Sequence, residues 1–243
     1  MTRPAPIRRL AVVVPARNEE ALLGDCLDSV AAAVDQARSA RPELATAVIV
    51  VADRCTDETA ARAHAAGAQV VASDAGSVGE ARRAGVDAAL ALRPATAAHA
   101  TWVASTDADT RVPPAWLRHQ LDQAERGVGL VVGRAVPDRR ELDERTWLRW
   151  HARHLDAGVG AHVHGANLGF RLDAYLAVGG WPPLNQHEDR RLVDAMLEAG
   201  VPAAAGLEVI TSARLRNRVP GGFAGYLRNL GGPVGADDAP SPA

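Results

Sequence analysis

Short apolar runs that alternate with helical segments constrain the fold of this chain more than any other feature. Five runs rich in valine and alanine have the length of buried strands: residues 10–14, 47–51, 69–72, 101–105 and 128–132. Helical spacing or a helix-start signal marks the segments between them: residues 18–30 with Asn18 as the expected cap, 56–66, 77–92 and the segment opened by Pro113 and Pro114. This alternation predicts an α/β fold with a mostly parallel central sheet flanked by helices.

The second half of the chain is less regular. Residues 141–156 and 188–198 are predicted helices, and the stretch from residue 158 to 169 is rich in glycine. Residues 232–243, rich in Gly, Pro and Asp, are expected to form a flexible tail.

Composition narrows the class of protein. A formal net charge of -2 without a basic block argues against nucleic-acid binding. Cys26 and Cys55 lie outside any C-x-x-C pair, so we expect two reduced thiols rather than a zinc site or a disulfide. The sequence has neither a signal-peptide pattern nor an apolar run long enough to cross a bilayer. We therefore expect a cytoplasmic protein, either free or held peripherally at a membrane.

Carboxylates follow the second and fourth predicted strands, at the sheet edge where α/β folds bind ligands. Asp107 and Asp109 flank one residue, so both can face one site, and hard oxygen ligands of this kind suit Mg²⁺ or Mn²⁺. Asp53 can accept a hydrogen bond from a nucleobase ring N–H. The ordinary alternative for each is an acidic turn or a helix cap. The position of Asp107 and Asp109 after a strand favours the metal.

Other polar side chains have a binding role and an ordinary role that the sequence leaves open. Glu188 and Asp189 begin a predicted helix, where a carboxylate acts as a general base or only favours the helix dipole. Arg82 either neutralises phosphate or lies on the surface. Trp181 either offers its aromatic face to a sugar or packs in the core. The arginines at alternate positions from residue 214 to 218 form either a phosphate clamp or an exposed strand face.

Six motifs in order resemble those of family 2 glycosyltransferases: residues 12–20 (VVVPARNEE), 52–59 (ADRCTDET), 81–85 (ARRAG), 107–109 (DAD), 165–170 (GANLGF) and 188–189 (ED). The resemblance covers roughly residues 8–230. It implies a single GT-A domain over residues 1–232, with a Rossmann-like nucleotide-sugar-binding half at about 8–135 and a smaller acceptor-binding half at about 136–231. It further implies inverting transfer from a UDP- or GDP-linked sugar to an acceptor hydroxyl, with Mn²⁺ or Mg²⁺ as cofactor.

The resemblance also implies roles for individual residues, carried over by position. The donor nucleotide would be bound by Pro15, Arg17, Glu19, Asp53, Arg82 and Asp107. Asp109 would bind the metal, Asp189 would be the general base, and Arg218 would supply a diphosphate contact. The donor sugar or acceptor would lie near Gly165, Ala166, Asn167 and Glu188.

Two features depart from the family pattern, and two other functions are considered. The family often has Asn or Gly where Arg54 stands and Asn where Arg83 stands. A sugar-phosphate nucleotidyltransferase usually has a Gly-rich basic loop after the first strand, and this chain has none there. A catalytically silent nucleotide-binding protein would not need the full set of carboxylates. The acceptor, whether a small molecule, a lipid-linked group or a glycan, and a homodimeric assembly are left open.

Overall fold

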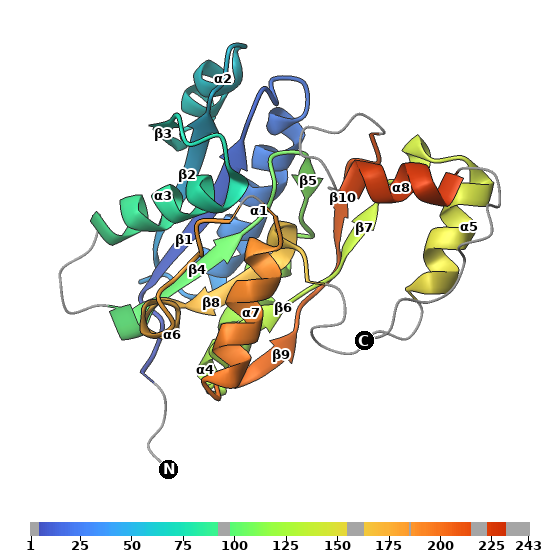
Figure 1. The fold of residues 1–243 in the computed structure, drawn as a ribbon. Coiled ribbons are helices and arrows are strands. Elements are labelled where there is room, and N and C mark those ends of the chain that lie inside the picture. Colours follow the sequence, from blue (N-terminus) through green and yellow to red (C-terminus); the bar gives the residue numbers. More distant parts are fainter. Residues whose placement is uncertain (1–4, 92–97, 155–162, 185, 215–222, 232–243) are drawn as a thin grey trace. The chain divides into compact units, whose positions relative to one another are not determined.

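The computed structural model of the protein describes residues 5–91, 98–154, 163–184, 186–214 and 223–231 (Figure 1). The chain divides into two compact units, one of Met1–Val136 and Gly158–Thr211, the other of Pro137–Ala157 and Ser212–Ala243. Its strands form a seven-stranded sheet of order β3-β2-β1-β4-β8-β6-β9 and a three-stranded sheet of order β5-β10-β7. Across the described ranges, no helix is at once long and apolar enough to cross a bilayer.

Four parallel strands form the first half of the large sheet: β1 (Arg9–Ala16), β2 (Ala45–Asp53), β3 (Gln69–Ser73) and β4 (Thr101–Ser105). β1 lies in the middle, with Val12 opposite Val48 on one side and Ala104 on the other. These strands are apolar along their length because both faces of a parallel sheet are covered by helices. The predicted α/β fold with a mostly parallel sheet is confirmed.

The remaining strands are short, and most of them escaped the sequence analysis. β8 (Leu168–Arg171) runs antiparallel between β4 and β6 (Leu130–Val132), and β9 (Ala203–Ala205) is parallel to β6. The small sheet contains strands of two or three residues: β5 (Thr110–Arg111), β7 (Ala135–Pro137) and β10 (Val209–Thr211). Strands this short show no measurable period, so apolar pattern alone does not reveal them.

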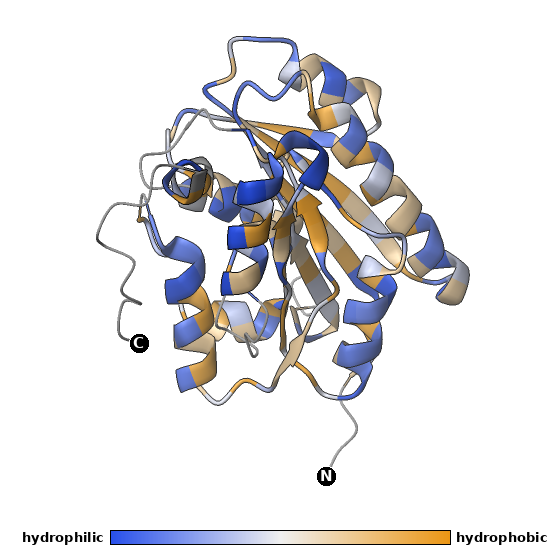
Figure 2. Ribbon diagram, turned by 90° about the vertical axis from the view of Figure 1, so that its right-hand side faces the viewer, coloured by the Kyte–Doolittle hydropathy of each residue, from blue (hydrophilic) through white to orange (hydrophobic). Residues whose placement is uncertain are grey.

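The sheet separates two hydrophobic layers. Val12 and Val14 point to the layer that contains α1 (Leu23–Ala40) and α4 (Trp116–Glu125). The intervening Ala11 and Val13 point to the other layer, formed by three helices: α3 (Val78–Ala91), α6 (Leu172–Ala177) and α7 (Glu188–Glu198). This is the alternation that a pleated strand requires. Figure 2 shows the hydrophobic colour concentrated on the strands, with polar residues on the outer sides of the helices.

The start of the first helix differs from the prediction. α1 begins at Leu23, with Leu22 at its N-cap, so the expected cap at Asn18 is wrong. Asn18 has a φ of 52°, and its side-chain oxygen instead accepts a hydrogen bond from the backbone N–H of Thr56 at 2.8 Å. The side chain joins two loops rather than ending a helix. The next helix, α2 (Thr59–Ala65), also starts three residues later than expected.

The smaller unit contains α5 (Glu144–Arg153) and α8 (Phe223–Gly231). Asp143 caps α5 by accepting a hydrogen bond from the N–H of Thr146 at 2.9 Å, so the helix begins three residues after the predicted Glu141. Its predicted end at Asp156 lies outside the described residues. Trp150 stacks on His154 with ring centroids 4.4 Å apart, and His154 meets the edge of Tyr226 from α8.

The packing of α3 on the sheet depends on Gly85, which gives the first prediction. A Cβ at this position would lie 3.1 Å from Cγ2 of Val51 and closer still to Cγ1 of Val13. We expect Gly85→Ala to lower the free energy of unfolding by about 1–3 kcal/mol, the usual cost of overpacking a core. Urea denaturation measures it.

Gly24 in α1 supplies the matched control, because a Cβ there would meet nothing within 4 Å. Gly24→Ala is expected to leave stability unchanged or to raise it by up to about 1 kcal/mol. Equal stability of both variants would show that α3 can shift away from the sheet at no cost.

Candidate functional site

The carboxyl ends of β1, β2 and β4 lie next to one another. The register places Ala16 opposite Ala52 and Val13 opposite Ser105. Pro15 is buried at the end of β1, Asp53 is the last residue of β2, and Asp107 follows β4 by two residues. Three of the predicted motifs therefore meet along one edge of the sheet, as the topology required.

The loops after β1 and β2 are tied together by hydrogen bonds. The N–H of Glu19 donates to the Thr59 hydroxyl at 2.7 Å, and the N–H of Glu20 donates to the Asp57 carboxylate at 3.1 Å. Glu19 is buried, whereas Arg17 is exposed. The two loops therefore present one joint surface in the region predicted to hold a nucleoside.

Asp53 is buried, and one of its oxygens is already bound within the protein. Oδ1 accepts hydrogen bonds from the Ser73 hydroxyl at 2.9 Å and from the N–H of Gly76 at 3.0 Å. These contacts fix the orientation of the carboxylate. Sequence reasoning missed Ser73 and Gly76, although both follow the third predicted strand at the same edge and the edge rule could have found them.

Three residues other than glycine adopt the left-handed conformation in the described part of the chain: Asn18, Arg54 and His187, with φ of 52°, 52° and 59°. Each is the sequence neighbour of a predicted site residue. Such conformations cost energy and cluster at functional sites. The Arg54 guanidinium pairs with the Asp74 carboxylate at 2.8 Å and also donates to the Asp74 carbonyl, which holds the strained turn beside Asp53.

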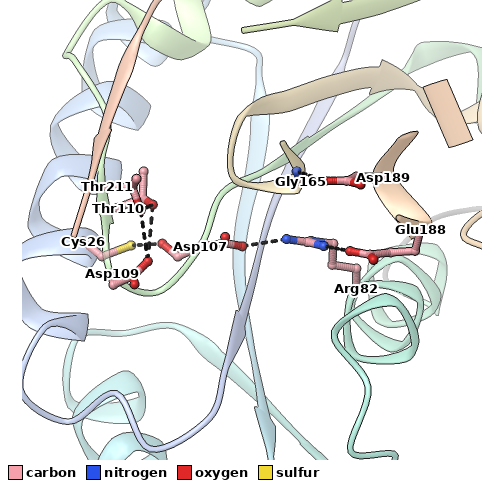
Figure 3. A network of polar contacts seen from close by, with 9 residues as sticks. All are labelled: Cys26, Arg82, Asp107, Asp109, Thr110, Gly165, Glu188, Asp189 and Thr211. Carbon is pink, nitrogen blue, oxygen red and sulfur yellow. Dashed lines mark hydrogen bonds and ion pairs between the residues drawn. The ribbon is translucent and has the colours of Figure 1, made fainter. Parts of the chain in front are cut away.

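The Asp107–Asp109 turn is anchored from both sides (Figure 3). The Cys26 thiol donates to the Asp107 carbonyl at 3.3 Å, and the hydroxyls of Thr110 and Thr211 lie 3.5 and 3.4 Å from Oδ1 of Asp109. Burial, with the nearby carboxylates of Asp109 and Asp107, raises the pKa of Cys26 far above its ordinary value, so the thiol stays protonated. Thr211 is 102 residues from Asp109, and no sequence signal pointed to it.

The two carboxylates of this turn fit a divalent ion of the magnesium or manganese type. Both side chains are partly exposed. Within the described ranges, no group of three or more His, Cys, Asp or Glu side chains is arranged to hold a metal. A site with one or two carboxylates is the usual arrangement for Mg²⁺, which takes its other ligands from water and from substrate phosphates.

Arg82 connects two motifs that are far apart in the sequence. This side chain on α3 is 3% exposed, yet its guanidinium pairs with Asp107 at 2.7 Å and with Glu188 at the start of α7 (Figure 3). Although burial opposes its charge, the carboxylates of Asp107, Glu188 and Asp189 raise the pKa of Arg82 above its ordinary value. Burial raises the pKa of Glu188, and Arg82 opposes that shift. The alternative in which Arg82 lies on the protein surface is therefore wrong.

Asp189, the predicted base, lies beside this ion-pair group. Its Oδ2 accepts a hydrogen bond from the N–H of Gly165 at 2.8 Å, and its position in the first turn of α7 favours the anion. Gly165 and Ala166 are buried in η3 (Gly165–Asn167). The motif at residues 165–170 therefore contacts Asp189 through a backbone N–H rather than through a side chain.

Trp181 and Asn167 point inward. Trp181 is 1% exposed and packs edge-on against Phe170 with ring centroids 6.3 Å apart, so its core role is the one observed. The Asn167 amide donates to the carbonyls of Arg134 and Leu207, and its oxygen accepts from the Trp116 indole at 2.8 Å. Asn167 thus connects three segments, while its predicted place near the donor sugar stays a prediction. Arg216 and Arg218 lie outside the described residues.

Comparison with known proteins adds a family to this geometry. The sequence model of "Glycosyl transferase family 2" matches residues 11–178. No curated protein matches the sequence significantly.

Solved structures share the fold at low sequence identity. TarS residues 1–349 of S. aureus is 15% identical with a TM-score of 0.58, covering 85% of this chain and 61% of TarS 1–349. Glucosyl-3-phosphoglycerate synthase of M. tuberculosis is 23% identical with a TM-score of 0.57, covering 92% of this chain and 79% of that one. The same synthase has been crystallised with Mn²⁺ and UDP-glucose. These similarities confirm the GT-A fold.

The buried amide of Asn167 gives the second prediction. Asn167→Ala would leave the Trp116 N–H and the Leu207 carbonyl without this partner, at about 1–3 kcal/mol for each buried unpaired group, whereas the Arg134 carbonyl still accepts from the N–H of Val209. Asn167→Asp keeps the acceptor for Trp116 but cannot donate, so it should also destabilise. Urea denaturation measures both, and Asn229→Ala at an exposed position of α8 is the neutral control. Unchanged stability of Asn167→Ala would contradict this structural role.

Proposed function

This chain belongs to glycosyl transferase family 2, and we propose that it moves a sugar from a nucleoside diphosphate donor to an acceptor hydroxyl with inversion at the anomeric carbon. One observation carries the proposal. A single buried guanidinium contacts Asp107 of one motif and Glu188, the neighbour of Asp189, of another. The carboxylates to which we assign donor binding and proton acceptance are about 80 residues apart in sequence, and their contacts to this one guanidinium support the proposal.

We assign the donor nucleoside to the surface formed by the loops after β1 and β2. Asp53 has one oxygen fixed by Ser73 and Gly76, so the carboxylate is oriented before the base arrives. An oriented, buried acceptor binds a ring N–H more strongly than an exposed one, because less reorganisation is needed. Pro15 at the end of β1, with Arg17 and Glu19 on the loop that follows it, shapes the same surface.

We assign the donor diphosphate to the turn at Asp107 and Asp109. A divalent ion held there, with Asp109 as its protein ligand, would neutralise negative charge on the departing diphosphate. Cys26, Thr110 and Thr211 hold the turn in place. A turn fixed in this way would suit a magnesium-type ion, which tolerates little deviation in the position of its ligands.

Asp189 is assigned as the base that accepts the acceptor proton. The N–H of Gly165 and the start of α7 favour its anionic form. They lower its basicity, which is acceptable because the hydroxyl loses its proton only as the new bond to the anomeric carbon forms. One displacement with a base on the acceptor side gives inversion without a covalent enzyme intermediate.

The division of labour along the chain is part of the same proposal. Donor recognition belongs to the half at about residues 8–135, and acceptor recognition to the half at about residues 136–231. UDP and GDP are both candidate nucleotides, and the acceptor hydroxyl belongs to a small molecule, a lipid-linked group or a glycan.

The third prediction tests donor binding. UDP and GDP titrated by calorimetry should bind at least about tenfold more tightly with Mn²⁺ than with EDTA, a difference of 1.4 kcal/mol. Asp109→Asn should remove this gain because it removes the charged metal ligand. Asp25→Asn, on the exposed side of α1, should keep it. Equal affinity of the preferred nucleotide in both buffers would reject the metal.

The fourth prediction tests the chemistry. Asp189→Asn keeps the size of the side chain and removes the basic form. We expect turnover to fall about 10²–10⁴-fold, the usual contribution of a general base, while nucleotide affinity stays near the wild-type value. Release of nucleoside diphosphate from UDP-glucose or GDP-mannose, with water as acceptor, measures turnover before the natural acceptor is identified.

Asp194→Asn is the matched control, because Asp194 lies on the same helix and pairs with Arg190 one turn away. It should turn over like the wild type. Should Asp189→Asn also do so, the base lies elsewhere, with Glu188 the first residue to test.

A further inference from the structure

Arg82 is enclosed on several sides by protein groups. Its two terminal nitrogens bind carboxylates from different parts of the chain, Nη2 to Asp107 at 2.7 Å and Nη1 to Glu188. Its central carbon lies 5.3 Å from the Trp181 ring centroid, within the range of a cation–π contact. The backbone of Gly165 also approaches closely, since a Cβ at Gly165 would overlap the guanidinium.

These contacts connect Arg82 to both proposed working carboxylates. It binds Asp107 directly. It reaches Asp189 by two short routes: through Glu188, the preceding residue on α7, and through Gly165, whose N–H donates to Asp189 at 2.8 Å (Figure 3). All of these residues belong to the same compact unit.

The same contacts make Arg82 a poor ligand for a phosphate. Both terminal nitrogens already bind carboxylates, and the N–H at Nε is buried and has no hydrogen-bond partner among the described residues. One positive charge here is surrounded by three carboxylates, those of Asp107, Glu188 and Asp189. An incoming diphosphate would meet a locally negative group and would have to displace a carboxylate to reach the guanidinium.

We propose that Arg82 is a positioning residue rather than a donor ligand: it holds Asp107 and the first turn of α7 in fixed relation, so that donor and base face the same reacting carbon. The proposal rests on the function proposed above. Only a planar fork with two separate N–H groups bridges two carboxylates in this way. A lysine ammonium is a single point charge and cannot span both.

Arg82→Lys tests the proposal, with Arg83→Lys as the matched control on the exposed side of the same helix. The assay follows release of nucleoside diphosphate from the nucleotide-sugar that the wild type prefers, and calorimetry gives the nucleotide Kd. We expect Arg82→Lys to lower kcat at least about tenfold while Kd changes less than about threefold, and Arg83→Lys to change neither. A Kd that rises as much as turnover falls would overturn the proposal, because that result marks a direct donor contact.

A second measurement does not depend on activity. Melting temperatures of Arg82→Met, Glu188→Gln and the double variant form a cycle around the ion pair. Arg82→Met leaves the buried Glu188 carboxylate and the partly exposed Asp107 carboxylate without their cation, so it should melt lower than the double variant, which removes the buried charge. If Arg82→Met is too unstable to purify, a folded double variant with low turnover and a nucleotide Kd near the wild-type value supports the proposal, and one with a Kd raised as much as turnover falls overturns it. Additive shifts would refute the coupling between Arg82 and α7. A folded wild type that releases no nucleotide from any donor would instead reject the proposed function.

Discussion

The parallel pairing of β1 with β2 on one side and β4 on the other is the constraint on which the other features depend. Because β1 pairs in parallel with β2 from Arg9 to Ala16 and with β4 from Arg9 to Val13, the three strands end at one edge of the sheet. The strand ends therefore fix the position of the first polar residue in each loop that follows. The hydrogen bonds among Asn18, Glu19, Thr56 and Thr59 then act on loops that are only a few ångströms apart.

Local pattern was enough for the parallel half of the fold and for the residues that follow its strands. β4 and α7 have the predicted bounds, Thr101–Ser105 and Glu188–Glu198, because apolar runs and helical spacing mark both clearly. The partners of those residues were not predictable. Arg82 and Glu188 are 106 positions apart, and nothing local indicates that they meet. β8 was missed because a four-residue strand carries no period, and Asn18 because its side chain bonds across space rather than to its own helix.

Arg82 and Glu188 are buried charges in an interior that consists mainly of apolar side chains. Transfer of an arginine and its carboxylates out of water is costly, and their attraction offsets that cost only with good geometry. Apolar residues that replace a buried ion pair at similar volume are often as stabilising or more so. The group is better understood as a device for orientation: Trp181, Gly165 and Glu188 restrict the guanidinium, and the guanidinium in turn restricts the carboxylate of Asp107.

The left-handed residues Asn18, Arg54 and His187 have a consequence for anyone who engineers this protein. Glycine adopts such a conformation without steric cost, and asparagine does so more readily than most residues. Asn or Gly in place of Arg54 would fit its φ of 52°. A library selected only for thermal stability would therefore change Arg54 and His187 early and release the Arg54–Asp74 contact. The positions where stability is easiest to gain thus lie at the edge where ligand is expected to bind.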